Sequence, residues 1–370
     1  MNLLATLLTA CACVFLLHSA ARADETLVWR DATTLKIEGK AWSDTESFLD
    51  RLPARALSQV SDDIKGLAKH SAGLAIRFAT DSDTLRVRWS LGDPAYAMTH
   101  MAATGTSGLD LYLKTLDGSW AYMGTGRPDG GQDNEWLAFD NQPRIQRTFL
   151  LYLPLFNRVT SLHLGLATGS SFEIVPNASG RTVVFYGTSI VHGGCASRPG
   201  MAYPAIIGRT LDCETVNLGF SGSARMEPVI CDLLAELDPA AYVIDALPNM
   251  HDEPITEKTL SSVRTIRTRR PTTPIVLVEN INYQTTRAFG GDNRGVRDLN
   301  ARFRKAYDQL LTEGCPELLY VPGDNLLGTD GEGTVDGTHP TDLGFTRMAG
   351  VIGPAVARAL ARRASAQPSP

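Results

Sequence analysis

The sequence predicts an α/β protein in which a parallel sheet follows an antiparallel β-sandwich. After residue 180, continuous apolar runs alternate with helical patterns, which is typical of a parallel sheet covered on both faces. Before residue 180, short runs that are apolar at every second position are separated by Gly, Asp and Pro, which is typical of an antiparallel sandwich. All five Trp lie in the first part, which supports two differently built halves.

The first half contains five alternating runs and one short helical pattern. The run Leu109-Asp-Leu-Tyr-Leu113 is followed by the turn Asp117-Gly118 and a further strand, so it predicts a hairpin. The predicted strands are 84–89, 109–113, a run from 120, 149–154 and 162–166, and the helical pattern is 64–71.

The second half contains five apolar strands with helices between them. The predicted strands are 181–187, 215–218, 241–245, 274–278 and 318–321. The predicted helices are 202–211, 224–237, 256–269, 294–313 and 341–362. The turn-forming run Asn177–Gly180 marks the boundary between the halves. The sequence therefore predicts a sandwich domain over 24–178, an α/β domain over 179–363 and a disordered tail over 364–370.

Residues 1–23 read as a secretory signal peptide. Leu3 to Leu17 is almost wholly apolar, and Ala21-Arg22-Ala23 offers a cleavage site, although no Lys or Arg precedes the apolar run. The run Leu8-Thr-Ala-Cys11 leaves open a lipid anchor at Cys11, and an ordinary buried helix is the other alternative. The prediction is an exported protein, periplasmic or secreted.

Composition excludes several classes of protein. Lys and Arg number 35 against 40 Asp and Glu, and no basic stripe is visible, so a nucleic-acid partner is not expected. No run of about 18 apolar residues follows the signal, so no transmembrane segment is expected. Four cysteines lie beyond the signal: Cys195, Cys213, Cys231 and Cys315. They could form disulfides or remain free thiols, and no C-x-x-C spacing favours a zinc site.

Polar residues follow the predicted parallel strands, at the sheet edge where such folds bind ligands. Ser189 comes just after the first strand, and a glycine turn that ends at Gly222 comes after the second. Asn249 follows the third strand, while Asp336 and His339 precede the last helix. Acyl transfer needs a nucleophile, a base, a group that orients the base and donors for an oxyanion. Together these residues fill all four roles.

These blocks, over residues 181–363, resemble the SGNH (GDSL-type) esterase superfamily, and the β-rich segment in front is similar to a bacterial two-domain subgroup of it. The resemblance implies a flavodoxin-like sheet of five parallel strands and a reaction without metal or organic cofactor. It implies a catalytic triad and two oxyanion donors: Ser189, Asp336 and His339, with Gly222 and Asn249.

The chain departs from the family pattern at two places. Thr188 stands where the family has Asp, and the third block reads Leu-Pro-Asn-Met where the family has Gly-x-Asn-Asp. The α/β-hydrolase alternative fails because no G-x-S-x-G occurs; the run from Gly219 to Ser223 lacks the last Gly.

Other residues offer alternatives to parts of this site. His251 with Asp252 is a rival base, and His192 is expected either to line the pocket or to start a helix at the surface. Trp120 and Tyr122 share a strand face, which suits either core packing or stacking on a sugar ring.

The predicted function is a secreted serine esterase that removes short acyl groups, with acetyl foremost, from a glycan or small-molecule ester. A lipid or thioester acylhydrolase of the same fold and a non-catalytic glycan-binding protein are the alternatives. The sequence sets neither the sugar nor the oligomeric state.

Overall fold

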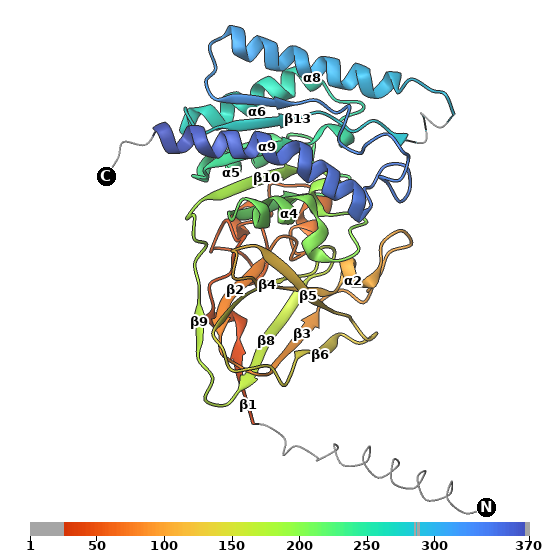
Figure 1. Ribbon diagram of the computed structural model, residues 1–370. Coiled ribbons are helices and arrows are strands. Elements are labelled where there is room, and N and C mark those ends of the chain that lie inside the picture. The colour runs from red at the N-terminus through yellow and green to blue at the C-terminus, as the bar shows by residue number, and fades with distance from the viewer. Residues whose placement is uncertain (1–25, 285, 287–288, 367–370) are drawn as a thin grey trace, which may run out of the picture.

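The computed structural model describes residues 26–284, 286 and 289–366. Figure 1 shows the helices and the parallel sheet gathered at the C-terminal end of the molecule, with the antiparallel strands packed beneath them. The predicted signal peptide, with Cys11, lies outside the described residues. Every helix in the described ranges is too short or too polar to cross a bilayer.

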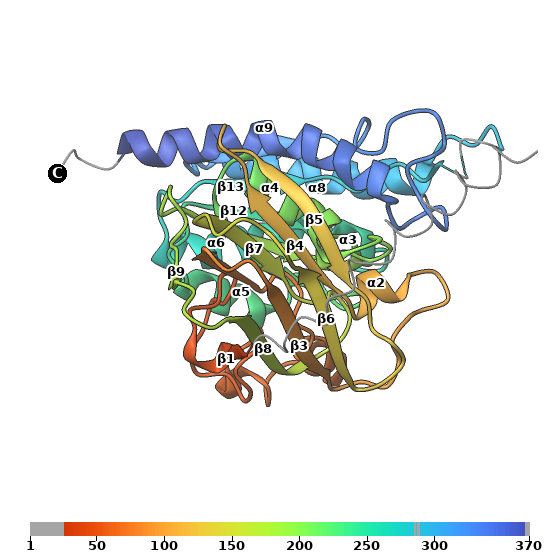
Figure 2. The same cartoon turned by 60° about the horizontal axis from the view of Figure 1, so that its bottom comes forward.

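The first half forms two antiparallel sheets that pack face to face (Figure 2). One sheet has the order β1 (Leu27–Asp31), β8 (Val159–Ala167), β3 (Leu85–Leu91), β6 (Asp133–Phe139). The other has the order β5 (Trp120–Gly126), β4 (Leu109–Lys114), β7 (Arg147–Tyr152), β2 (Ala75–Thr80), β9 (Phe172–Ile174). Their inward side chains, among them Phe78, Trp89 and Leu111, form one buried core, so the predicted sandwich is confirmed.

The second half forms the predicted five-stranded parallel sheet. Its order is β11 (Glu214–Gly219), β10 (Thr182–Gly187), β12 (Ala241–Asp245), β13 (Ile275–Val278), β14 (Leu318–Val321), which is the flavodoxin-like order. Alternate residues of each strand enter different cores. In β10, for example, Val184 and Tyr186 face one side of the sheet, whereas Val183 and Phe185 face the other.

Helices cover both faces of this sheet. α4 (Tyr203–Thr210) and α9 (Asp342–Ala366) lie on one face, and α5 (Pro228–Glu236), α6 (Ile255–Arg269) and α8 (Arg294–Thr312) lie on the other. α5 begins four residues later than predicted, because Met226 has a positive φ of 55° and Pro228 suits only the first turn of a helix. α9 continues to Ala366, three residues into the predicted tail.

The two halves share a buried interface. The outer face of the second antiparallel sheet packs on α4, where Tyr112 and Tyr152 meet Ala205. Beside them the fully buried Asp110 accepts a hydrogen bond of 2.7 Å from Arg198, which lies just before α4. Burial raises the pKa of Asp110 to about 6, and Arg198 limits that rise.

Residues 38–73 of the first half lie against the outer edge of β11. Arg51, 2% exposed, donates to the carbonyls of Asn217 and Gly219 on that edge at 2.9 and 3.0 Å. It also donates to the carbonyls of Leu67 and His70. From the same segment Trp42, Leu52 and Ile64 enter the core of the α/β half. The connection between β9 and β10 contains the expected boundary at residue 178, which we retain as a proposal for the division of the chain.

We expect Arg51→Met to lower the free energy of unfolding by about 3 kcal/mol or more, because four carbonyls lose their donor and at least two of these bonds are buried. Arg55 in the same segment is a matched control, since its ion pairs with Asp44 and Glu236 are exposed. Arg55→Met should cost less than about 1 kcal/mol. Urea denaturation of both variants measures the difference, and equal losses would contradict the role given to Arg51.

Candidate active site

Three adjacent strands carry the first group of predicted site residues. β10 pairs with β11 on one side and β12 on the other, with Gly187 opposite both Gly219 and Asp245. Ser189 follows Gly187 by two residues, Gly222 follows Gly219 by three, and Asn249 follows Asp245 by four. Because parallel strands end at one edge of their sheet, these loops emerge side by side.

Ser189 begins a short helix, α3 (Ser189–His192), directly after β10. Thr188 is the N-cap, and its hydroxyl accepts from the backbone N–H of Ile190. A Cβ on Gly187 would lie 2.1 Å from the carbonyl oxygen of Asp245, so only glycine permits this approach of the two strand ends. The turn holds Ser189 rigidly, with 8% of its surface exposed.

Asp336 and His339 lie in the loop that precedes α9. His339 Nε2 is 2.9 Å from Ser189 Oγ, and His339 Nδ1 is 2.7 Å from Asp336 Oδ2. The backbone N–H of His339 donates to Asp336 Oδ1 at 2.7 Å, so one carboxylate holds both the ring and the main chain. Partial burial favours a higher pKa for Asp336, but hydrogen bonds from the backbone and ring of His339 outweigh it and lower the pKa to about 2.

The two predicted oxyanion donors, the backbone N–H of Gly222 and the side-chain amide of Asn249, donate no hydrogen bond among the described residues. Gly222 is exposed and has a φ of 69°, a conformation that glycine adopts readily. The side-chain nitrogen of Asn249 is buried and has no hydrogen-bond partner among the described residues. An unpaired buried N–H is costly, and such groups in native structures are commonly kept for a ligand or a reacting atom.

Neither of the two other histidines considered above makes a hydrogen bond with Ser189 among the described residues. His251 and Asp252 are both exposed, and neither makes a hydrogen bond or ion pair within the described ranges. His192 neither lines a pocket nor starts a surface helix, so both alternatives for it are wrong. It is fully buried, its Nε2 lies 2.6 Å from the carbonyl of Leu155, and its ring stacks on Phe156. Burial holds the pKa of His192 well below the usual value.

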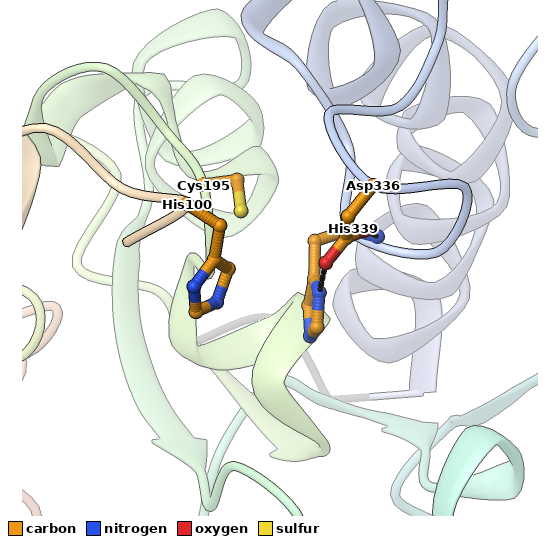
Figure 3. A group of neighbouring side chains, drawn as sticks. All are labelled: His100, Cys195, Asp336 and His339. Carbon is orange, nitrogen blue, oxygen red and sulfur yellow. Dashed lines mark hydrogen bonds and ion pairs between the residues drawn. The ribbon is translucent and has the colours of Figure 1, made fainter. Parts of the chain in front are cut away.

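The sequence analysis missed a histidine from the first half. His100, in the loop between β3 and α2 (Ala103–Thr106), has its ring centroid 5.4 Å from that of His339. Figure 3 shows the two rings side by side, tilted by 45°, with Cys195 above His100 on the side toward His339. His100 is 239 residues from His339 and sits in no periodic pattern, so the sequence carries no signal for this contact.

The four cysteines of the described part are free thiols. Burial raises the pKa of Cys195 to about 12, and the charge of Asp336 adds to the rise, so this thiol is not a nucleophile at neutral pH. His100, Cys195, Asp336 and His339 each present one donor atom within 4.8 Å of the others. This group of side chains could hold a metal ion.

Comparison with known proteins extends over both halves. A family model described as the GDSL-like lipase/acylhydrolase family matches residues 180–357. A second, the GxDLY N-terminus of SGNH-hydrolase-type esterases, matches residues 27–172. Residues 108–112, Gly-Leu-Asp-Leu-Tyr, fit the pattern in that name and include the buried Asp110. The sequence analysis read them only as a strand.

Solved structures resemble the whole chain. A Bacteroides ovatus protein assigned as a GDSL-like lipase is 35% identical, with a TM-score of 0.84 over 91% of this chain and 98% of that one. The salicylyl-acyltransferase SsfX3 of a tetracycline biosynthetic pathway is 20% identical, with a TM-score of 0.73 over 91% and 98%. A family two carbohydrate esterase from Cellvibrio japonicus is 14% identical, with a TM-score of 0.58 over 91% and 99%. The last two show the fold alone.

The curated proteins gave no significant match. The likeness to the Bacteroides ovatus protein nevertheless spans almost all of both chains, and the two family models follow one another along the sequence. The chain therefore belongs to the GDSL-like lipase/acylhydrolase family of SGNH hydrolases and is a hydrolase of ester bonds.

Proposed function

We propose that this hydrolase is a serine esterase with Ser189 as nucleophile, His339 as general base and Asp336 as the group that orients the base. The continuous hydrogen-bonded path from Ser189 to His339 to Asp336, at 2.9 and 2.7 Å, is the observation that carries the proposal. An ionised Asp336 accepts the Nδ1 proton, which leaves the lone pair of Nε2 directed at the serine hydroxyl.

The reaction proceeds in two steps. His339 takes the hydroxyl proton of Ser189 as the serine oxygen attacks the acyl carbonyl, and the resulting imidazolium returns that proton to the leaving alcohol. A water molecule then gives a proton to His339 and attacks the acyl-enzyme, and the proton passes back to Ser189 as the acid leaves. The N–H groups of Ser189 and Gly222 and the side-chain amide of Asn249 stabilise the oxyanion in both steps.

For the substrate we propose a carbohydrate that carries a short, acetyl-sized O-acyl group. A cavity of about 490 Å³ lies between the two halves and is lined by Tyr122, Met123 and Trp136 of the first and Ser197 of the second. Tyr122 is 48% exposed, and Arg198 covers one face of its ring at 4.0 Å, so the remaining surface of the ring is available for a sugar. Trp120 is partly buried against Arg77 and Lys114. Ser197 is two residues from Cys195, so the Cα atoms of these residues lie within about 8 Å of each other. The cavity is therefore next to the loop of Cys195, which lies beside His339.

We also propose export through the segment 1–23, on the strength of its apolar run and cleavage motif. A lipid or thioester acylhydrolase is the second candidate, and a profile over acyl lengths separates it from the first. Preference for octanoate over acetate esters would favour the lipid substrate. Binding of glycan without any hydrolysis would favour the non-catalytic alternative.

Ser189→Ala and His339→Ala should each abolish hydrolysis of p-nitrophenyl acetate, because each removes a group that the first step requires. Asn249→Ala should lower kcat by about 10²–10³, the usual loss for one oxyanion donor. His251→Ala is the matched control, two residues away and exposed, and should keep full activity. Full activity in Ser189→Ala would disprove the assignment of the nucleophile.

The pH profile should show a single protonation on its acid side. Asp336 remains ionised down to about pH 2, so above that pH His339 is the one member of the triad whose protonation removes activity. Log kcat/KM should therefore fall with a slope of one. Asp336→Asn should lower kcat without changing this slope, and a limiting slope of two in the wild type would show that a second group titrates.

Tyr122→Ala should raise KM for an acetylated oligosaccharide about fivefold to tenfold, the loss of about 1 kcal/mol of stacking. Its activity on p-nitrophenyl acetate should stay within about twofold, since that ester needs no sugar site. Leu137→Ala, next to Trp136 and on the opposite face of β6, is the control. An unchanged KM in Tyr122→Ala would remove the cavity from the substrate site.

A further inference from the structure

We propose that His100, Cys195 and His339, with Asp336 beside them, form a binding site for Zn²⁺, and that a bound ion inhibits the esterase reversibly. The inhibition, though not the binding, rests on the proposed function, because it requires His339 to be the catalytic base.

The four side chains come from three separate parts of the chain. Figure 3 shows His100 on a loop of the first half, Cys195 on the loop after α3, and Asp336 and His339 on the loop before α9. One donor atom of each lies within 4.8 Å of the others. Donor atoms around a tetrahedral zinc are roughly 3.3–3.7 Å apart, given Zn–N and Zn–S bonds of about 2.0–2.3 Å. Side-chain rotations that move the donor atoms by about 1 Å would bring them to the separations found around a zinc ion.

The chemistry of the donors selects the metal. Two imidazoles, a thiolate and a carboxylate form the kind of mixed set that zinc accepts, and imidazole and thiolate together favour it over magnesium or calcium. When Zn²⁺ binds, the Sγ–H bond of Cys195 breaks, the sulfur bonds to the metal and the proton leaves to solvent. No electron is transferred, so the step is reversible by a chelator.

The backbone presents these groups in fixed positions. Cys195 has a φ of 71°, a conformation that non-glycine residues seldom adopt, and it lies between two local hydrogen bonds, from Gly194 N–H to Ser189 and from Ala196 N–H to Gly193. His100 lies in a tight turn closed by two hydrogen bonds between Met98 and Met101.

The first half packs tightly on the loop of Cys195. A Cβ on Gly105, in α2, would lie 2.1 Å from the carbonyl oxygen of Ala196. This contact keeps the turn of His100 beside the loop of Cys195. The site is also open to ions from solvent, since the side chains of His339 and Asp336 are 22% and 36% exposed.

Either nitrogen of His339 gives inhibition when it binds the ion. Coordination through Nε2 removes the lone pair that accepts the proton of Ser189. Coordination through Nδ1 replaces the proton that is shared with Asp336, which breaks the hydrogen bond that orients the ring. The free protein is therefore active and the zinc-bound protein is not.

Zinc inhibition of p-nitrophenyl acetate hydrolysis tests the proposal in four variants. His100→Ala and Cys195→Ser should each raise the zinc concentration for half inhibition by about tenfold or more, the scale of loss when a metal site is damaged. His251→Ala and Cys315→Ser are matched controls outside the site and should stay within about twofold of the wild type. EDTA should restore activity, and Mg²⁺ and Ca²⁺ should not inhibit.

Cobalt binding gives a readout that does not depend on activity. Co²⁺ added to Ser189→Ala protein should give a thiolate-to-cobalt charge-transfer band, and Zn²⁺ should displace it. The band should vanish in the Ser189→Ala/Cys195→Ser double variant and weaken in Ser189→Ala/His100→Ala. Absence of the band in Ser189→Ala protein, or equal zinc sensitivity in all four single variants, would overturn the proposal. If the wild type were inactive on every ester, the band would still decide whether the site binds metal.

Discussion

The open edge of β11 is the constraint on which the rest of the structure depends. β11 is the outermost strand of the parallel sheet, and the loop with Gly222 follows it directly. The carbonyls on its outer side need donors, because buried polar groups without partners destabilise a fold. Arg51 supplies those donors from the first half, and burial lowers its pKa to about 9. The first half is thus a structural part of the α/β unit.

A second contact connects the halves closer to the active site. The buried pair of Asp110 and Arg198 fixes the segment that leads from α3 to α4, and the backbone N–H of Gly200 also donates to Asp110. Removing Arg198 would leave the carboxylate of Asp110 desolvated without its charged partner, which costs more than losing a surface ion pair. Since Cys195 and Ser197 lie on this segment, the pair also sets one wall of the site. The loop of Cys195 therefore depends on the Asp110–Arg198 pair, whereas the position of Ser189 depends on β10.

Local patterns made much of the fold and site predictable. The apolar run of β10 identifies a strand buried on both faces. The spacing of Asp336 and His339 is enough to predict their pairing, because one carboxylate contacts the backbone and ring of a residue three positions later. β2 could not be identified by alternation, because the sandwich core and the α/β half cover its two faces and all six residues are buried. The contacts of Arg51 with β11 and of His100 with His339 join residues more than 160 positions apart, and no local period reflects such contacts.

The site thus combines residues held in place by the parallel sheet with residues that lie on adjustable loops. Ser189 and Asn249 follow the central strands of the sheet, so their positions are set by a ladder of backbone hydrogen bonds. His339 lies in a loop, where the backbone N–H of Val335 donates to its carbonyl, and its ring is oriented by Asp336, by Ser189 and by the ring of His100. The residues around the base come from loops of both halves, and loops accept substitutions more readily than strands do. Changes in those loops can alter which alcohol or ion meets His339 while Ser189 and Asn249 stay in place.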